Sequence, residues 1–494
     1  MTPRQILYCS SEAYPLIKTG GLGDVAGSLP RALQQLGHEV RLLLPAYRDL
    51  VNNLPQRPRQ RGQWQIDGQP VTLWQTTLPG SRVKTWLVDC PEYFDRPGNP
   101  YHDADGEPWP DNAQRFALFD KVAALLASDQ LGLEWQPDIA HGNDWQCGLL
   151  PVYLNEFDRR PATVFTIHNL AYQGLFDRAT FDQLGLPESL WHFSALEYHD
   201  QLAFIKGGLV YADHLTTVSP TYAREIQTPA FGQGMEGLLA HRAADLSGIL
   251  NGIDTRVWNP GTDRLIVKRY NRQNLSDKQI NKQALQAQFD LPQDNDRLLM
   301  GMVTRLAEQK GIDLVLDSLP DLVKLPVQLV ILGSGDKDYE QRLQQAVRQY
   351  PRQLGLTLGY DESLAHRIEA GADLFVMPSR FEPCGLNQLY SQRYGTLPLV
   401  TPVGGLADTV VDTPLDTTGK TLQETGASGF VMSEVSQMAL EAALHRAVQL
   451  YARPALWQQV QRVAMGRDFS WQRSAGRYVQ LYEQLLQQRP DTRT

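Results

Sequence analysis

Short runs of consecutive apolar residues alternate with longer helical patterns through the first half of the chain. In the first forty residues an apolar run, Gln5–Ser10, is followed by a glycine-containing loop, a helical pattern over about 23–36 and a second apolar run at 39–44. Continuous short apolar runs are typical of strands buried on both faces. Further strands are predicted at 84–89, 139–141, 163–167 and 214–218, and a helix at 112–127. This alternation predicts a parallel sheet with crossover helices.

The second half of the chain repeats this alternation after a polar stretch that contains one amphipathic helix at 276–289. The predicted strands are 298–303, 327–332, 355–358, 374–377 and 397–400, and the predicted helices are 311–323, 338–349, 362–370 and 386–394. From Ser436 onward the pattern is mostly helical. Two such series predict the α/β class, with two doubly wound, Rossmann-like domains.

We divide the chain into an N-terminal domain at 1–251, a linker at 252–262, a C-terminal domain at 263–465 and a C-terminal segment at 466–494. The two halves share one short similar segment, Gly20-Gly-Leu-Gly-Asp24 and Gly404-Gly-Leu-Ala-Asp408. This similarity agrees with two related halves but is too short to prove a duplication. In doubly wound sheets ligands bind beyond the carboxyl ends of the strands. Residues that follow the predicted strands are therefore the candidates for binding and catalysis.

Composition and charge narrow the class of protein. Hydrophobic residues make up 42% of the 494 residues and charged residues 20%, which supports a substantial core and excludes wholesale disorder. The formal net charge of −9 argues against a nucleic-acid or anionic-membrane partner. No apolar stretch is long enough to span a bilayer, and the N-terminus has no secretory apolar run. The four cysteines form no CxxC pair, so neither a disulfide framework nor a metal site is expected. A cytoplasmic protein is the expectation.

The segment Lys18-Thr-Gly-Gly-Leu-Gly-Asp24 lies between a predicted strand and a predicted helix. Glycines there let backbone N–H groups approach an anion, and the helix dipole favours negative charge. The segment matches neither the P-loop nor the GxGxxG fingerprint. A tight turn with a solvated lysine is the alternative interpretation.

A second cationic segment, Arg305-Leu-Ala-Glu-Gln-Lys310, follows the first strand of the second half. Two cations five residues apart in a loop before a helix can converge on one diphosphate. Solvated charge is the ordinary interpretation of such spacing, but the position at a strand's carboxyl end favours a phosphate site.

Ser379-Arg-Phe-Glu-Pro-Cys-Gly-Leu386 follows the predicted strand at 374–377. Its Glu382 stands beside Pro and Gly, where it can bind sugar hydroxyls or stabilise positive charge. A helix-capping carboxylate is the alternative for Glu382. Cys384 is more simply a buried small residue than a reactive thiol.

Two histidines stand near predicted strand ends, in His141-Gly-Asn-Asp-Trp145 and Ile167-His-Asn169. We expect the side chains of both histidines to point into one shared opening at the strand ends, and to have functional rather than purely structural roles. The aromatic residues Tyr14, Tyr101, Trp145 and Tyr172 either stack on sugars or pack against the core.

Together these segments resemble bacterial glycogen and starch synthases, which are ADP-glucose-using, retaining glucosyltransferases with the two-domain GT-B fold. The resemblance runs in family order over nearly the whole chain, through the segments 18–25, 96–102, 144–145, 166–174, 211–213, 218–225, 234–238, 250–254, 305–311, 379–386, 394–398, 404–409 and 468–471. It implies two Rossmann-like domains facing a deep cleft. It also implies that the segment at 466–494 holds a helix that crosses back to the first domain.

The resemblance assigns roles position by position. It implies a catalytic group of His168, Arg305, Lys310 and Glu382, in which His168 contacts the transferred glucose, the two cations hold the diphosphate, and Glu382 binds glucose hydroxyls. Tyr360 would stack on the base. The substrate-binding residues implied are Lys18, Gly20, Gly21, Asp24, Asp144, Asn169, Asn251, Tyr360, Cys384, Gly385 and Leu386. No cofactor and no metal are implied.

The expected reaction moves glucose from ADP-glucose to the non-reducing end of glycogen or another α-1,4-glucan. Glu382 is the only clear candidate for a covalent intermediate, although same-face attack is our expectation. The segment His141-Gly-Asn-Asp-Trp145 departs from the more usual His-x-His-Asp-Trp, which bears on acceptor choice. Two alternatives are a GT-B transferase using UDP-glucose and a small sugar, and a non-catalytic glucan-binding scaffold. The sequence indicates no particular oligomeric state.

Overall fold

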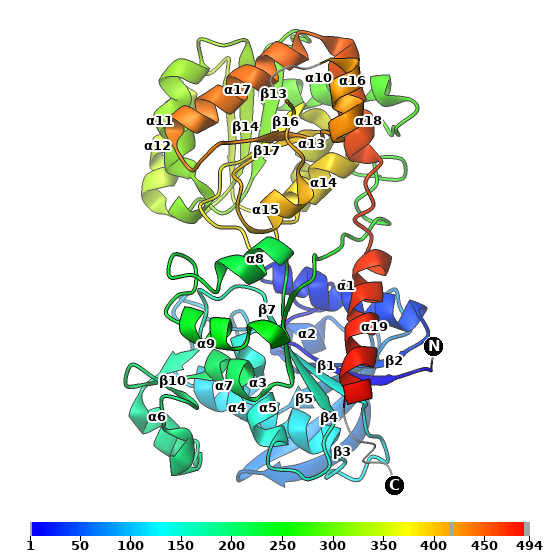
Figure 1. Ribbon diagram of the computed structural model, residues 1–494, viewed down its shortest axis with the longest axis vertical. Coiled ribbons are helices and arrows are strands. Elements are labelled where there is room, and N and C mark those ends of the chain that lie inside the picture. Colours follow the sequence, from blue (N-terminus) through cyan, green and yellow to red (C-terminus); the bar gives the residue numbers. More distant parts are fainter. Residues whose placement is uncertain (1, 415–417, 489–494) are drawn as a thin grey trace. The chain divides into compact units, whose positions relative to one another are not determined.

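The computed structural model describes residues 2–414 and 418–488, which form two compact units. Unit 1 comprises Met1–Gly252 and Trp471–Thr494, and unit 2 comprises Ile253–Ser470. The chain therefore changes unit at 252/253 and again at 470/471, whereas the sequence pattern predicts a linker at 252–262 and a final segment from 466. Each unit is an α/β layer structure with helices on both faces of its main sheet (Figure 1).

Unit 1 is built on a nine-stranded sheet. Only β3, β4 and β5 form antiparallel pairs, β3 with β4 and β4 with β5; every other neighbouring pair is parallel. In sheet order the strands are β12 (Leu246–Gly248), β11 (His214–Thr217), β7 (Ala162–Ile167), β6 (Ile139–Asn143), β1 (Gln5–Cys9), β2 (Glu39–Pro45), β5 (Lys84–Asp89), β4 (Gln69–Thr77) and β3 (Arg59–Ile66). The chain leaves β1 toward β2 and later returns to the other side at β6. This reversal beside β1 is the switch point at which doubly wound sheets bind ligands.

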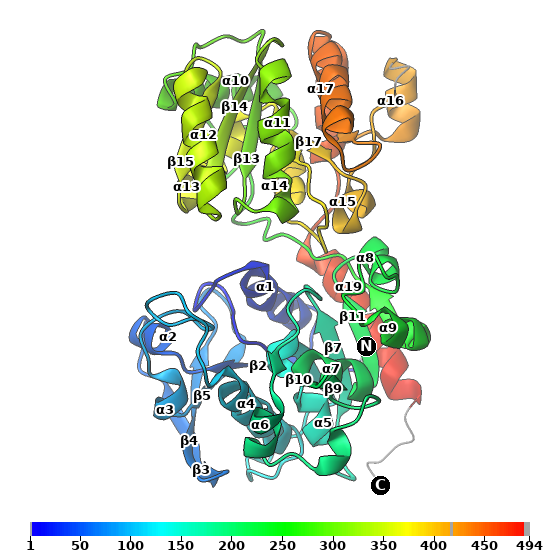
Figure 2. The same ribbon diagram turned by 90° about the vertical axis from the view of Figure 1, so that its left-hand side faces the viewer.

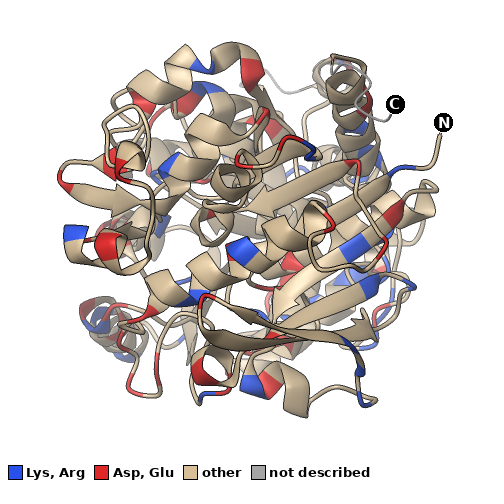
Figure 3. Ribbon diagram, turned by 90° about the horizontal axis from the view of Figure 1, so that it is seen from below, with Lys and Arg blue, Asp and Glu red and all other residues tan. Residues whose placement is uncertain are grey.

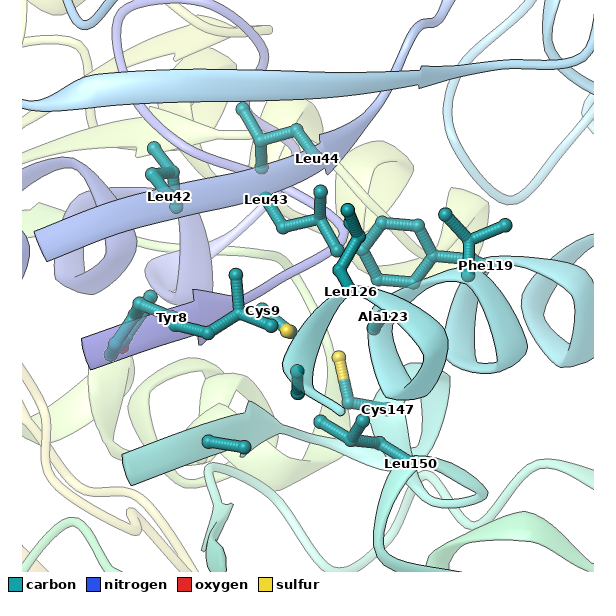
Figure 4. Packing of buried hydrophobic residues seen from close by; sticks show 14 of the residues in the cluster. Tyr8, Cys9, Leu42, Leu43, Leu44, Phe119, Ala123, Leu126, Cys147 and Leu150 are labelled. Carbon is teal, nitrogen blue, oxygen red and sulfur yellow. The ribbon is translucent and has the colours of Figure 1, made fainter. Parts of the chain in front are cut away.

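Between and after these strands, unit 1 contains α-helices. They are α1 (Gly21–Gln35), α2 (Arg48–Asn52), α3 (Pro91–Phe94), α4 (Asn112–Ala127), α5 (Leu150–Leu154), α6 (Arg178–Gln183), α7 (Phe204–Tyr211), α8 (Pro220–Glu225), α9 (Glu236–His241) and α19 (Trp471–Gln488). The C-terminal helix α19 packs against α1. Figure 4 shows the core beneath α4, where the thiols of Cys9 and Cys147 lie among leucine side chains. Both thiols are free and buried.

Two polar hairpins of unit 1 were not predicted. Strands β3 and β4 join through Asp67-Gly68, and both turn residues have positive φ, as a two-residue hairpin turn requires. A small antiparallel sheet of β8 (Leu175–Phe176), β10 (Gln201–Ala203) and β9 (Glu197–Tyr198) has a similar turn at His199-Asp200. These strands are too polar or too short to give an apolar run. The Asp-Gly dipeptide was the available signal for the first hairpin.

Unit 2 is built on a six-stranded, wholly parallel sheet (Figure 2). In sheet order the strands are β15 (Leu354–Leu358), β14 (Val327–Gly333), β13 (Leu298–Val303), β16 (Leu374–Met377), β17 (Leu397–Val400) and β18 (Phe430–Val431). The switch point lies between β13 and β16. Alternate residues of β13 serve two cores: Leu298 and Met300 pack into one cluster and Leu299 into the other.

The helices of unit 2 cover both faces of its sheet. They are α10 (Lys278–Gln288), α11 (Ile312–Leu322), α12 (Lys337–Gln349), α13 (Glu362–Gly371), α14 (Asn387–Arg393), α15 (Gly404–Thr409), α16 (Gly419–Thr425), α17 (Gln437–Tyr451) and α18 (Pro454–Met465). Residues of α11, α12, α17 and α18 fill one core, and residues of α10 and α13 fill the other. The predicted α/β alternation of this half is confirmed, with the strands at 298–303, 374–377 and 397–400 observed at their predicted limits.

Candidate functional site

In unit 2 a shielded ion pair joins the loops that follow β13 and β16. Lys310 Nζ lies 2.6 Å from Glu382 Oε2, and these side chains are only 18% and 9% exposed. The Ser379 hydroxyl donates to the same carboxylate oxygen at 3.1 Å. Because the pair is largely shielded from water, its attraction is stronger than that of a surface ion pair.

A second set of contacts holds these two loops together. The Arg380 guanidinium donates to both carboxylate oxygens of Asp313, at 2.9 and 2.6 Å, and its backbone N–H donates to Gln309 O at 2.8 Å. The Gln309 side chain in turn donates to Phe381 O at 3.2 Å. A bidentate arginine–carboxylate pair fixes direction as well as distance. The position of Lys310 beside Glu382 therefore follows from the loops and not from the ion pair alone.

Glycines let the backbones of unit 2 approach this pair closely. Gly311 has φ +69°, and a Cβ there would lie 2.2 Å from Pro378 O. Gly404 has φ +43°, and its Cβ would lie 2.0 Å from Glu382 O, while the Gly405 N–H donates to the same carbonyl at 3.1 Å. Only residues without a side chain fit at these contacts. Three loops, after β13, β16 and β17, therefore meet at Glu382.

The other predicted site residues of unit 2 differ in solvent exposure. Arg305 is exposed and its guanidinium donates to Gln309 at 3.2 Å. Cys384 is 5% exposed, and Gly385 has φ +69° in the turn before Leu386, the N-cap of α14. Tyr360 is 76% exposed and follows β15, two strands from β13 in the sheet. The structure thus brings Lys310 and Glu382 into contact and leaves the Tyr360 ring accessible for stacking.

In unit 1 the loop after β1 is held by a carboxylate that was not predicted. Glu12 is buried, and its Oε2 accepts from the backbone N–H of Thr19 at 2.5 Å and of Gly20 at 3.1 Å. Its Oε1 accepts from the hydroxyls of Thr19 and Tyr101, each at 2.5 Å. The Gly20 N–H therefore serves Glu12 in this structure, and α1 begins at Gly21, two residues earlier than predicted.

Lys18 lies at the surface of this loop. Its ammonium donates to Asp24 of the first turn of α1 at 2.8 Å and lies 5.6 Å from the Tyr14 ring centroid. Among the described residues no side chain caps the start of α1, and a Cβ on Gly20 or Gly21 would meet none of their atoms within 4 Å. The first turn of α1 thus combines unoccupied space with the positive end of a fifteen-residue helix.

A buried carboxylate, Asp144, connects the loops after β6 and β7. Its Oδ1 accepts from the backbone N–H of His168 at 2.8 Å and of Asn169 at 3.4 Å. Asp144 also has φ +57° and ψ −178°, a strained backbone conformation adopted almost only by glycine. Burial raises the pKa of the Asp144 carboxyl to about 7, although the two N–H donors oppose the rise. Strain and a shifted pKa at a strand end are features of functional sites.

The expectation that His141 and His168 point into one shared opening at the strand ends is wrong for His141. Strand β6 extends two residues beyond its predicted end, so His141 lies inside it, fully buried. Its Nδ1 lies 2.7 Å from the Tyr482 hydroxyl of α19 and its Nε2 2.6 Å from the Thr166 hydroxyl. His141 is a structural link between the sheet and α19. His168 is half-buried just after β7, and burial lowers the pKa of its imidazole to about 3.

Asn251 follows β12 and is 6% exposed, and its buried Oδ1 has no hydrogen-bond partner among the described residues. An unpartnered buried amide oxygen is costly unless a ligand or water supplies a donor. This unpartnered oxygen is consistent with a binding role for Asn251.

A cavity of about 330 Å³ opens beside Trp145. It is lined by Pro108, Trp109, Asn112, Trp145, Ala171, Tyr172, Gln173, Gly174, Leu175 and Phe176. Aromatic rings beside a few amide groups suit the apolar faces and hydroxyl edges of sugars. Of the four aromatic candidates, Trp145 and Tyr172 line this cavity, whereas the Tyr101 hydroxyl supports Glu12.

Charges of both signs are interspersed over the ribbon in Figure 3. Within residues 2–414 and 418–488 no group of three or more His, Cys, Asp or Glu side chains is arranged to hold a metal ion. In the same ranges no helix is long and apolar enough to cross a bilayer.

Sequence reasoning missed the residues that hold the site rather than form it. Glu12, Ser379 and Asn143 each contact a predicted site residue, namely Gly20, Glu382 and His168, and Arg380 ties the Glu382 loop to Asp313 of α11. Glu12 and Ser379 stand within a few residues of a strand end, which was the available signal. The partners of Arg380 and Asn143 are far apart in sequence, so no local pattern identifies them.

Comparison with known families and structures agrees with this geometry. Residues 5–241 match the family model "Starch synthase catalytic domain", and residues 284–458 match "Glycosyl transferases group 1". Glycogen synthase 1 of Methylococcus capsulatus is 54% identical over 98% of this chain and 97% of its own length. Glycogen synthase of Cellvibrio japonicus is also 54% identical, over 97% of this chain and 99% of its own.

Among solved structures, the catalytic domain of starch synthase IV from Arabidopsis thaliana, bound to ADP and acarbose, is 32% identical with a TM-score of 0.85. The alignment covers 99% of this chain and 100% of that one. Sucrose-phosphate synthase from Thermosynechococcus elongatus, at 18% identity and a TM-score of 0.60, shares the fold.

Proposed function

The chain belongs to the glycogen synthase family and is a glycosyltransferase with the GT-B fold, and from this premise we propose that it elongates glycogen. The proposed reaction transfers glucose from ADP-glucose to the non-reducing 4-hydroxyl of an α-1,4-glucan with retention of configuration. The observation that carries the proposal is the shielded Lys310–Glu382 pair at the switch point of a doubly wound sheet.

On the donor side we propose that Arg305 and Lys310 hold the diphosphate. In the transfer the bond from glucose C1 to the diphosphate oxygen breaks, and negative charge grows on the leaving group. Fixed cations stabilise that charge without reorganisation. Glu382 would bind glucose hydroxyls, with Cys384, Gly385 and Leu386 lining the sugar and phosphates. Tyr360, with most of its ring exposed, would stack on the base.

In unit 1 we propose that Lys18 and the first turn of α1 contact the donor's phosphates. The unoccupied space beside Gly20 and Gly21 supports this role, and Asp24 would orient Lys18 through their ion pair. His168 and Asn169 would contact the transferred glucose, since Asp144 fixes the backbone of both. Asn251 would accept a hydrogen bond from a substrate hydroxyl at its unpartnered Oδ1.

For the acceptor we propose the aromatic cavity beside Trp145, which is large enough for one sugar unit of a glucan and continues to an open side. As the 4-hydroxyl attacks C1 from the face that the diphosphate leaves, its proton passes to a departing phosphate oxygen. This same-face route needs no covalent bond to Glu382. Exclusion of water would then favour the glucan over hydrolysis.

The test is a panel that pairs labelled ADP-glucose or UDP-glucose with glycogen, maltooligosaccharides or small sugars. We expect chain growth with ADP-glucose and an α-1,4-glucan. Transfer from UDP-glucose to a small sugar would instead identify another GT-B transferase, and glucan binding without transfer would identify a scaffold. We also propose a cytoplasmic location, since the four free cysteines fit a reducing compartment.

A further inference from the structure

Asn143, the last residue of β6, is fully buried and contacts the imidazole of His168. Its Nδ2 lies 2.9 Å from the carbonyl oxygen of Cys9. A carbonyl can only accept, so the amide nitrogen must face Cys9 and the amide oxygen must face the other way. The orientation of this side chain is therefore settled by its neighbour.

The amide oxygen of Asn143 faces two donors. The Tyr8 hydroxyl lies 3.0 Å from Oδ1, and His168 Nε2 lies 2.9 Å from the same atom. An amide oxygen carries no hydrogen, so the hydrogen of this second contact must sit on His168 Nε2. Burial keeps the pKa of the His168 imidazole near 3, so the ring is neutral near neutral pH. Its other nitrogen, Nδ1, then carries a lone pair.

We propose that Asn143 is a positioning residue that holds His168 as the Nε2–H tautomer, so that Nδ1 accepts a hydrogen bond from a hydroxyl of the bound sugar. The inference rests on the proposed contact of His168 with glucose. It adds a requirement of its own: the ring nitrogen on the substrate side is an acceptor, never a donor. A bound hydroxyl satisfies this nitrogen, whereas a carbonyl or ether oxygen in its place would face a lone pair.

The tautomer is measured directly from ¹⁵N shifts of histidine-labelled protein, with His168→Gln identifying the signal among the ten histidines. We expect wild-type His168 to show a protonated Nε2 and an unprotonated Nδ1. Tyr8→Phe is the matched control, because it removes the other donor to Oδ1 and leaves the His168 contact in place; its tautomer should not change. A protonated Nδ1 in the wild-type protein overturns the proposal, whether or not glucose transfer is detected.

Two substitutions of Asn143 connect the tautomer to activity. Asn143→Leu keeps the size of the side chain but removes the acceptor, and we expect a mixture of the two His168 tautomers and a kcat about tenfold lower.

Asn143→Asp puts a carboxylate beside Nε2, which favours the imidazolium form of His168. The activity of this variant relative to wild type should therefore fall several-fold from pH 8 to pH 5.5. The titratable groups around the ring, Tyr8, His141 and Asp144, are common to both proteins. An unchanged tautomer in Asn143→Leu, or an unchanged pH profile in folded Asn143→Asp, overturns the proposal. Absence of transfer by the wild-type protein instead refutes the proposed function.

Discussion

The two glycine pairs, Gly20-Gly21 and Gly404-Gly405, have nearly the same sequence around them and opposite surroundings. Each pair stands where a helix begins, α1 in unit 1 and α15 in unit 2. A Cβ at either member of the first pair would meet no atom of residues 2–414 and 418–488 within 4 Å. A Cβ at either member of the second would lie 2.0 Å from a backbone oxygen, of Glu382 or Cys384.

The same glycine motif therefore has a different structural effect in each unit. In unit 2 the absence of side chains lets one part of the chain pack against another, which holds the Glu382 loop in place. In unit 1 it leaves space open at a helix N-terminus, where an incoming anion gains from N–H groups. A glycine pair in a sequence identifies a close approach, but not whether the approaching partner is the chain itself or a ligand.

The largest effect is expected from Gly405→Ala. The added methyl would meet Cys384 O, a backbone atom that cannot move aside, and we expect the free energy of unfolding to fall by about 4 kcal/mol. Chemical denaturation monitored by fluorescence measures this. Stability within about 0.5 kcal/mol of wild type would show that the Glu382 loop relaxes easily.

Lys310→Ala tests the pair that the second glycine motif supports. We expect kcat to fall by about 10²–10³ with little change in KM for glycogen, since the cation would stabilise the leaving diphosphate. Lys324→Ala is the matched control, because Lys324 lies in the turn after α11, is 72% exposed and forms a surface ion pair with Asp321. Near-normal turnover of folded Lys310→Ala removes Lys310 from the catalytic group.

The buried carboxylates extend the comparison. Glu382 of unit 2 has a lysine partner, whereas Asp144 of unit 1 is held by N–H groups. The folded pKa of Asp144, about 7, exceeds its ordinary value, so its contribution to stability is lost as pH rises toward 7. Relative to Asp144→Asn, the wild-type protein should therefore lose roughly 2–3 kcal/mol between pH 5 and pH 8. Parallel denaturation curves at each pH measure this, and a constant difference contradicts it.

Gly21→Ala should have the smallest effect on stability. The space is open and φ is not positive, so the free energy of unfolding should rise by at most about 1 kcal/mol through helix propensity. The methyl would nevertheless occupy the proposed anion site, and we expect kcat/KM for the donor to fall several-fold. Unchanged donor kinetics would place the phosphates elsewhere.

Local pattern was enough for most regular elements, and it failed where polar strands form by pairing. The apolar runs of β1, β13 and β16 are buried on both faces, so their composition alone identifies them. Strands β3 and β4 have alternating exposure and many polar residues, and only their antiparallel pairing makes them strands.

For the candidate site, strand ends in the sequence identified Lys310, Glu382, Asp144 and His168, because residues at the carboxyl ends of parallel strands share one edge of a sheet. Their partners required the folded chain. Nothing local predicts that Glu12 would bind the loop of Lys18, or that His141 would bind Tyr482 across 341 residues.

The amino-acid sequence by itself determined the α/β class, the order of most strands and helices along the chain and the positions of the charged loops, because periodicity and turn chemistry act over a few neighbouring residues. Only the tertiary structure decided which polar group meets which: Glu12 at the Gly20 N–H, Arg380 at Asp313, and Asn143 at His168. Such contacts depend on how strands are ordered across a sheet, and that order is set by the packing of whole layers rather than by any short segment.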